Sequence, residues 1–216
     1  DGEYYMQAKG TKFNIIGNIF DQIPKDYEYF FIPDDDLYMK SSDINKLFEI
    51  AKQYELSICQ PSLVGYYSVI INLHHPGFIL RYTNFVEIIG PCFYKHAFEF
   101  CKDTFTYNKS CWGIELLWNK NLGFPNDKIA VVDDVIAVHT RPCFWGDNYF
   151  NNGIDEPYQE CKKLIEENGL SWDKVVYKSI EKNINYDLPS ETRIYPPIDE
   201  MHQFYKQIGK KKNFFI

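Results

Sequence analysis

The segment YEYFFIPDDDL, residues 27–37, decides how we interpret the fold. Its first seven residues form a short apolar and aromatic run, which is typical of a strand buried on both faces. Three aspartates follow at once, and Ser42 then caps a predicted helix whose apolar positions recur every three or four residues. Ligands of open α/β sheets gather at the carboxyl ends of strands. The segment therefore predicts a strand, an acidic turn and a helix, with the aspartates facing a ligand.

The rest of the chain continues this alternation of strands and helices. Further strands are predicted at residues 56–59, 68–73, 85–89 and 129–139, the last of them broken at Asp133-Asp134, and His75-Pro76-Gly77 is a turn signal. Helices are predicted at residues 7–20, 94–105, 112–119, 155–168, 171–182 and 198–208. The pattern predicts an α/β fold with a central, mostly parallel mixed sheet flanked by helices. Residues 1–150 would form its core and residues 151–216 a C-terminal helical flank of the same domain.

Composition and charge narrow the class of protein. A chain of 216 residues, 45% of them hydrophobic, suits one well-buried domain. The formal net charge of −7 argues against a protein that neutralises a nucleic-acid backbone. No apolar stretch reaches the roughly 18 residues of a membrane span. The six cysteines form no C-x-x-C pair, so we expect reduced, mostly buried thiols and a cytoplasmic setting.

The acidic turn suggests metal chemistry. Alternate residues of an extended segment point the same way, so Asp34 and Asp36 can reach one ion while Asp35 meets another partner, such as a ribose hydroxyl. A hard divalent cation held by carboxylates neutralises the charge that develops on a pyrophosphate leaving group. The same three aspartates also fit a solvated turn at the start of a helix, so the motif alone leaves both interpretations open.

Several motifs taken together resemble a known family. In chain order they are DDDL (34–37), QPSL (60–63), FVEIIGPCF (85–93), CWGIELLW (111–118) and VVDDVIAVHTRP (131–142). This series is similar to a glycosyltransferase-like family with the GT-A fold, known from plants, bacteria and large DNA viruses of algae, and it covers about residues 27–143. The family's GT-A fold normally has a nucleotide-binding strand and helix ahead of the acidic strand. Because only 33 residues precede Asp34, we expect the base-binding half to lie upstream.

The resemblance implies transfer of a sugar from a nucleotide-diphosphate donor, expected to be a UDP sugar, to a glycan or glycoprotein acceptor in the cytoplasm, or in the host cytoplasm for a viral member. Mn²⁺ or Mg²⁺ would be held by Asp34, Asp36 and His139. Asp36 would take part in catalysis, and Glu115 would be the general base if the reaction inverts the anomeric centre. Donor contacts would come from Asp34, Asp35, Gln60, Ser62, Glu87, Trp112 and Arg141.

Each of these residues also has a structural interpretation. His139 can be a strand-end histidine bonded to the backbone, and Trp112 a core aromatic residue beside Trp118. Glu87 lies among apolar neighbours, so its carboxyl group must be paired or functional. Two other functions stay open: a non-catalytic domain that binds a nucleotide sugar or glycan, and a metal-dependent phosphohydrolase.

Overall fold

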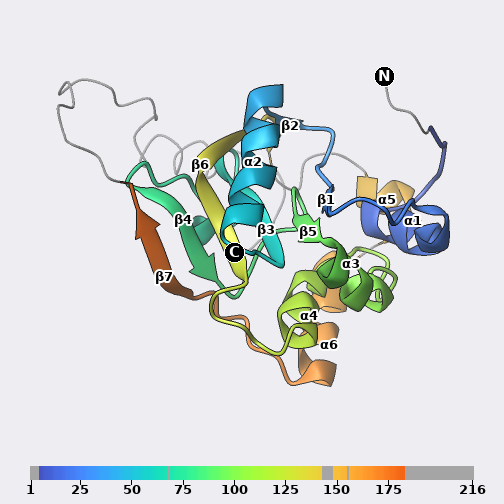
Figure 1. Ribbon diagram of the computed structural model, residues 1–216. Helices are drawn as coiled ribbons and strands as arrows, with labels where there is room; N and C mark the ends of the chain where they lie inside the picture. Colours follow the sequence, from blue (N-terminus) through green and yellow to red (C-terminus); the bar gives the residue numbers. More distant parts are fainter. Residues whose placement is uncertain (1–4, 68, 143–147, 155, 183–216) are drawn as a thin grey trace. The chain divides into compact units, whose positions relative to one another are not determined.

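A seven-stranded sheet forms the centre of the protein in the computed structural model, which describes residues 5–67, 69–142, 148–154 and 156–182 (Figure 1). The strands run in the order β1-β5-β3-β6-β4-β7, and β2 pairs with the far end of β6. Their bounds are β1 Tyr29–Phe31, β2 Leu37–Tyr38, β3 Ile58–Gly65, β4 Phe78–Thr83, β5 Cys92–Tyr94, β6 Ile129–His139 and β7 Val176–Glu181.

The sheet is mixed, but mostly antiparallel. Among the described strands, β3 and β6 are the only parallel pair, and every other pairing is antiparallel. The prediction of a mostly parallel sheet was therefore wrong. A parallel neighbour needs a crossover of a dozen or more residues, and the eight residues between β4 and β5 contain no helix. Because β5 runs antiparallel to both β1 and β3, strands β1, β3 and β6 still end at the same edge of the sheet.

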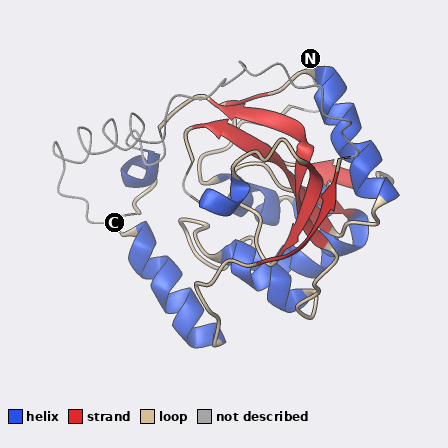
Figure 2. Cartoon of the chain, turned by 90° about the vertical axis from the view of Figure 1, so that its left-hand side faces the viewer, coloured by secondary structure: helices blue, strands red, loops and turns tan. Residues whose placement is uncertain are grey.

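Helices cover both faces of this sheet (Figure 2). Their bounds are α1 Lys12–Asn18, α2 Ser41–Gln53, α3 Lys95–Cys101, α4 Ile114–Asn121, α5 Asn148–Asn151 and α6 Pro157–Asn168, with 3₁₀ turns η1 Phe20–Gln22, η2 Ile70–Asn72 and η3 Lys102–Thr104. On one face α2 buries Leu47 and Ala51 against alternate residues of the strands. On the other face α1, α3, α4 and α6 surround an aromatic core built from Phe13, Phe93, Phe98, Phe105 and Trp118.

Several predicted elements are correct. The helices at 94–105 and 155–168 are present in slightly shorter form, and the second ends at Gly169 in the left-handed conformation. The predicted N-terminal helix begins only at Lys12. The buried residues in and beside it are Thr11, Phe13 and Phe20. The five described cysteines are buried, reduced thiols, as expected. Cys143 and the helix predicted at residues 198–208 lie outside the described residues.

Other predicted elements are wrong. The run 27–33 forms only a three-residue edge strand with half-buried side chains, and Ser42 lies inside the first turn of α2 rather than at its cap. Residues 70–72 are a 3₁₀ turn, and residues 85–89 form a loop. The helix expected from residue 171 is replaced by β7, which pairs with β4. Here β-branched and aromatic residues, Val175, Val176 and Tyr177, outweigh the capping signal at Ser171.

Strand β3 continues past Cys59, where the predicted strand ends, and runs through Pro61, because a bulge in β6 lies opposite. The register jumps from Pro61–Val132 to Ser62–Ile136, so three residues of β6, beginning with Asp133, loop out of the ladder. A proline, which has no N–H to donate, is tolerated at such a site. The predicted break at Asp133-Asp134 is therefore real, although β6 is one continuous strand.

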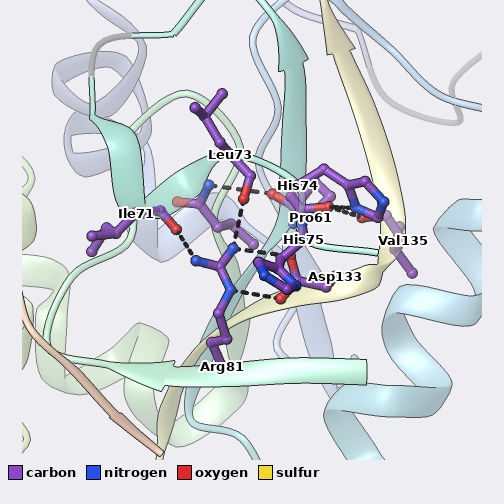
Figure 3. Close-up of polar contacts among 10 residues, drawn as sticks. Pro61, Ile71, Leu73, His74, His75, Arg81, Asp133 and Val135 are labelled. Carbon is purple, nitrogen blue, oxygen red and sulfur yellow. Dashed lines mark hydrogen bonds and ion pairs between the residues drawn. The ribbon is translucent and has the colours of Figure 1, made fainter. Parts of the chain in front are cut away.

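A buried ion pair holds this bulge (Figure 3). The fully buried Asp133 carboxylate accepts hydrogen bonds from Arg81 Nε at 2.7 Å and Nη2 at 2.9 Å, and from the backbone N–H of His75 at 2.8 Å. Arg81 also donates to the carbonyls of Ile71 and Leu73, each at 2.7 Å. The bulge is thus tied to β4 and to the segment that precedes it.

Candidate functional site

The acidic turn that follows β1 is fastened to its neighbours by backbone hydrogen bonds. The N–H of Asp34 donates to the carbonyl of Ile89 at 2.7 Å. The carbonyl of Asp36 accepts from the N–H of Thr140 at 3.0 Å and from its hydroxyl at 2.9 Å. The next residue, Leu37, pairs with His139 in the β2–β6 ladder. The turn therefore lies at the shared carboxyl edge of β1 and β6, which is where the sequence argument expected it.

Asp36 and His139 face each other across this edge. Oδ2 of Asp36 lies 3.4 Å from Nε2 of His139, and both side chains are largely buried. Nδ1 of His139 lies 3.0 Å from the carbonyl oxygen of Tyr66. A carbonyl oxygen only accepts, so Nδ1 carries a proton, and in the neutral ring Nε2 presents a lone pair to the carboxylate.

The backbones of β3 and β6 approach each other closely beside His139. Gly65 pairs with His139 at the end of the β3–β6 ladder and has a φ of +88°. A Cβ atom at this position would lie 2.6 Å from the carbonyl oxygen of His139. Glycine is therefore required here for both its backbone conformation and its lack of a side chain.

Asp34 is bound to a lysine that the sequence analysis missed. Nζ of Lys12, from α1, lies 2.6 Å from Oδ1 of Asp34. Burial raises the pKa of the Asp34 carboxyl group, and the Lys12 ammonium opposes that shift. No local sequence signal links residues 12 and 34, because the contact depends on how α1 packs beside β1.

Asp35 points away from this cluster. Its side chain is 84% exposed, and Oδ2 lies 3.5 Å from Nη2 of Arg141, which is also exposed. The two residues thus form a weak surface ion pair on the outer side of the acidic turn.

The donor atoms of Asp36 and His139 fit a divalent cation in part. Oδ1 of Asp36 is buried without a hydrogen-bond partner among the described residues, so this carboxylate has spare capacity. Adjacent ligands of an octahedral Mg²⁺ lie about 3 Å apart, close to the observed Asp36–His139 separation. Within the described ranges, however, no three His, Cys, Asp or Glu side chains are arranged together to hold a metal. Of the predicted ligands, Asp34 instead binds Lys12.

A second group of polar residues surrounds Glu87, in the loop that precedes β5. Oε1 of the buried Gln60 accepts the N–H of Glu87 at 2.5 Å, and Nδ2 of Asn72 donates to Oε2 of Glu87 at 2.9 Å. Burial raises the pKa of Glu87 to about 7, the hydrogen bond from Asn72 lowers it, and the charge of Asp34 raises it further. Gln60 therefore positions the loop and is not placed to contact a ligand directly.

Glu115 lies in the first turn of α4, within electrostatic range of Glu87. Its Oε2 is buried and has no hydrogen-bond partner among the described residues. Burial raises the pKa of Glu115 to about 8, and the charge of Glu87 adds to the shift. The preceding Gly113 has a φ of +87°, and a Cβ atom there would lie 2.7 Å from Sγ of Cys161 in α6. The glycine thus lets α4 begin against α6 with Glu115 directed inward.

Trp112 packs beside the same site. Its Nε1–H donates to the hydroxyl of Tyr149 in α5 at 2.6 Å, and the two rings meet edge to face. Trp112 precedes α4 and is half-buried, whereas Trp118 lies in the core. The sequence analysis did not single out Tyr149, which interacts electrostatically with both Asp34 and Glu115.

Ser62 has a structural role. It is fully buried, and its hydroxyl donates to the carbonyl of Val135 at 3.0 Å. The same oxygen lies 2.9 Å from Nδ1 of His74. Because the hydroxyl proton is already committed, His74 Nδ1–H must be the donor, so this pair is not arranged as a nucleophile and its base.

An open groove of about 530 Å³ runs along β1 as far as Pro33, and no residue of the acidic turn lines it. Consecutive residues of β1 line it, together with Lys12 and Ile16 of α1 and the half-exposed Tyr27. Neighbouring residues of a strand point to opposite faces, so a groove that all of them line runs along the open edge of the strand. Its aromatic walls suit a flat or ring-shaped ligand.

Comparison of the chain with protein-family models, with curated proteins and with solved structures finds no match. The function is therefore argued from the site itself. None of the described helices is long and apolar enough to cross a membrane.

Proposed function

We propose that the protein is a divalent-metal-dependent glycosyltransferase of GT-A-like fold, which uses a nucleotide-diphosphate sugar as donor and a glycan hydroxyl as acceptor. The observation that carries the proposal is the Asp36–His139 pair, with an unpaired carboxylate oxygen at the carboxyl edge of β1 and β6. Asp36 and His139 would hold Mn²⁺ or Mg²⁺, and the donor's phosphate oxygens would complete the coordination. The ion supplies positive charge that stabilises the departing nucleotide.

The surroundings of this pair support the same function. The aromatic groove along β1 offers a place for the donor's rings next to the acidic turn. Glu115 is the candidate base for an inverting reaction, because its carboxyl group is buried near Glu87 and has an oxygen to spare. Glu87 would contact the donor sugar, and Arg141 at the rim would contact phosphate.

The pH dependence of the reaction should report Glu115. A general base works only when ionised, and the pKa of Glu115 is about 8. We therefore expect kcat/KM to rise with pH, close to tenfold per unit below pH 7, and to level off above about pH 8. Initial rates measured from pH 5.5 to 9 at saturating Mn²⁺ would show this. A flat profile over that range would remove Glu115 from the role of base.

The test of the function is a thermal-shift screen of nucleotide sugars with and without Mn²⁺, followed by a turnover assay on any donor that stabilises the protein. We expect one donor to stabilise the protein in an ion-dependent way and to be slowly hydrolysed. Asp36→Asn should lower that turnover by about 10²-fold or more, because an amide is a weaker ligand than a carboxylate.

Asp26→Asn is the matched control, since Asp26 is exposed and lies just ahead of β1. It should retain turnover within about twofold. Binding of a donor without any turnover would instead indicate a non-catalytic nucleotide-sugar-binding domain. Cleavage of simple phosphate esters without preference for nucleotide sugars would indicate a phosphohydrolase.

A further inference from the structure

Asn72 is a fully buried residue with one satisfied and one unsatisfied side-chain atom. Its Nδ2 donates to Oε2 of Glu87 at 2.9 Å, whereas its Oδ1 has no hydrogen-bond partner among the described residues. A buried polar atom without a partner costs free energy, so stability alone would not favour this side chain. The useful part of Asn72 is therefore the N–H that it directs at Glu87.

Arg81 holds Asn72 in place. Its Nη1 donates to the carbonyl of Ile71 and its Nη2 to that of Leu73, each at 2.7 Å (Figure 3). These two carbonyls belong to the residues directly before and directly after Asn72. The backbone N–H of Asn72 also donates to the carbonyl of Val69 at 3.1 Å, within the 3₁₀ turn η2. The backbone that carries the Asn72 side chain is therefore fixed on both sides.

Glu87 is held from two directions. Its backbone N–H donates to Oε1 of Gln60 in β3, and its carboxyl group accepts from Asn72. The direction of the second bond follows from chemistry, because a carboxylate oxygen only accepts, and a flipped amide would set two oxygens against each other. The contact therefore selects a Glu87 side chain whose Oε2 carries no proton, and it fixes the orientation of the carboxyl group.

Charged groups of other elements also act on Glu87. Burial raises the pKa of Glu87, and the hydrogen bond from Asn72 is the strongest influence that lowers it. The charge of Asp34 raises this pKa, and that of Lys174 lowers it less than Asn72 does. Burial, and then the charge of Glu87, raises the pKa of Glu115 in α4. Asn72 thus opposes the burial of Glu87 in surroundings that contain two further acidic groups.

We propose that Asn72 is a positioning residue of the candidate site: its amide holds the carboxyl group of Glu87 in one orientation and as a hydrogen-bond acceptor, and Arg81 holds Asn72. An ionised Glu87 in a fixed orientation accepts hydrogen bonds from the hydroxyl groups of a bound ligand. That this ligand is a donor sugar rests on the proposed function. The control of Glu87 by Asn72 does not.

The titration of Glu87 tests the proposal without any ligand. It is followed by NMR of ¹³C-labelled glutamate side chains from pH 4.5 to 10, and the signal is assigned through its absence in Glu87→Gln. Asn72→Leu is similar in size and removes the donor, so the midpoint of the Glu87 titration should move up by at least about one pH unit. Asn121→Leu is the matched control. It removes an exposed asparagine that donates to the carbonyl of Phe100 at 3.0 Å, and it should leave the midpoint unchanged.

Unfolding in urea gives a second readout. Glu87 has a pKa of about 7 in the folded protein, above its value of 4.5 in the unfolded chain, so its ionisation lowers the free energy of unfolding as pH rises. Asn72→Leu raises the folded pKa further, which deepens this fall. The variant should therefore lose more stability at pH 8 than at pH 5. An equal loss at both pH values would overturn the proposal, because a purely structural role does not depend on the charge of Glu87.

A second variant keeps the test decisive if Asn72→Leu does not fold. Asn72→Asp keeps the shape of the side chain but replaces the amide donor with an acidic group, so the two carboxyl groups titrate as a pair. The last proton of this pair should leave at a higher pH than the proton of Glu87 in the unmodified protein. A midpoint for Glu87 that stays the same in either folded variant would contradict the positioning role.

Turnover separates this inference from the proposed function. With a sugar donor, Asn72→Leu should raise KM for the donor at least 10-fold, and Asn121→Leu should leave it within twofold. A shifted Glu87 titration in Asn72→Leu, with no turnover of any sugar donor by the unmodified protein, would leave the role of Asn72 intact and remove the transferase. Turnover by the unmodified protein, with an unchanged Glu87 titration in the Asn72 variants, would do the reverse.

Discussion

Glu115→Gln is expected to lower turnover of the sugar donor by at least about 100-fold while making the protein more stable at pH 8. The first effect follows because an amide cannot take the proton of an acceptor hydroxyl. The second follows from burial, since ionised Glu115 sits in a low-dielectric environment with no partner among the described residues for its Oε2. Loss of activity with gain of stability is typical of a carboxyl group kept for function.

The direction of the pH effect on stability follows from the pKa of Glu115 in the folded and in the unfolded protein. Glu115 has a pKa of about 8 in the folded protein, above its value of 4.5 in the unfolded chain. Between these values the folded state holds the extra proton, so the free energy of unfolding falls as pH rises and levels off above about pH 8. Glu115→Gln removes this fall, and we expect a gain on the order of 4 kcal/mol at pH 8 and about 1 kcal/mol at pH 5.

Urea unfolding of the parent and of Glu115→Gln at pH 5 and at pH 8 measures the gain in unfolding free energy at each pH. Glu49→Gln, on the exposed side of α2, is the control and should leave the free energy of unfolding within about 0.5 kcal/mol at either pH. A Glu115→Gln variant that is less stable than the parent at pH 8 would show that the carboxylate is stabilised by its surroundings. It could not then serve as a base with an elevated pKa.

How much of the fold the sequence could predict depends on how local each signal is. The helices at α2 and α6 follow from apolar spacing within a single segment, and the structure contains both. Strand direction is not local. Whether β3 pairs with β5 or β6, and in which sense, depends on contacts between residues more than 30 positions apart, so the mostly parallel sheet was a poor prediction.

The candidate site likewise contains some residues that local sequence signals predict and others that they do not. Asp36 and His139 could be predicted, because each ends or follows a strand and those strands finish at one edge. Lys12 and Tyr149 could not, since each reaches the site from a short helix that has no motif of its own. Gln60 and Ser62 were predicted as ligand contacts from a strand end, but β3 continues to Gly65 and buries both inside the sheet.

Asp133→Asn is expected to lower the free energy of unfolding by about 3–5 kcal/mol. The mutation leaves the guanidinium of Arg81, which is 90% buried by side-chain area, without its charge partner. Asp134→Asn is the matched control. Asp134 is the next residue in the chain, is part-exposed, and pairs with Lys46 at 2.7 Å and Lys182 at 2.9 Å. This variant should lose only about 1 kcal/mol of unfolding free energy. Thermal or urea unfolding at pH 7 compares the two, and a loss below 1 kcal/mol for Asp133→Asn would contradict the expectation.

The same bulge places the candidate site, so the mutation should also weaken Mn²⁺ binding. The register of β6 against β3 shifts by three residues at Asp133, and an odd shift exchanges the faces on which all later side chains lie. This puts His139 on the face of Ala130, Val132 and Ala137, next to Leu37 and the acidic turn. A regular ladder would direct it to the other face, away from Asp36. The Arg81–Asp133 pair therefore acts at a distance on the candidate metal ligand, because it holds the bulge that sets the orientation of His139.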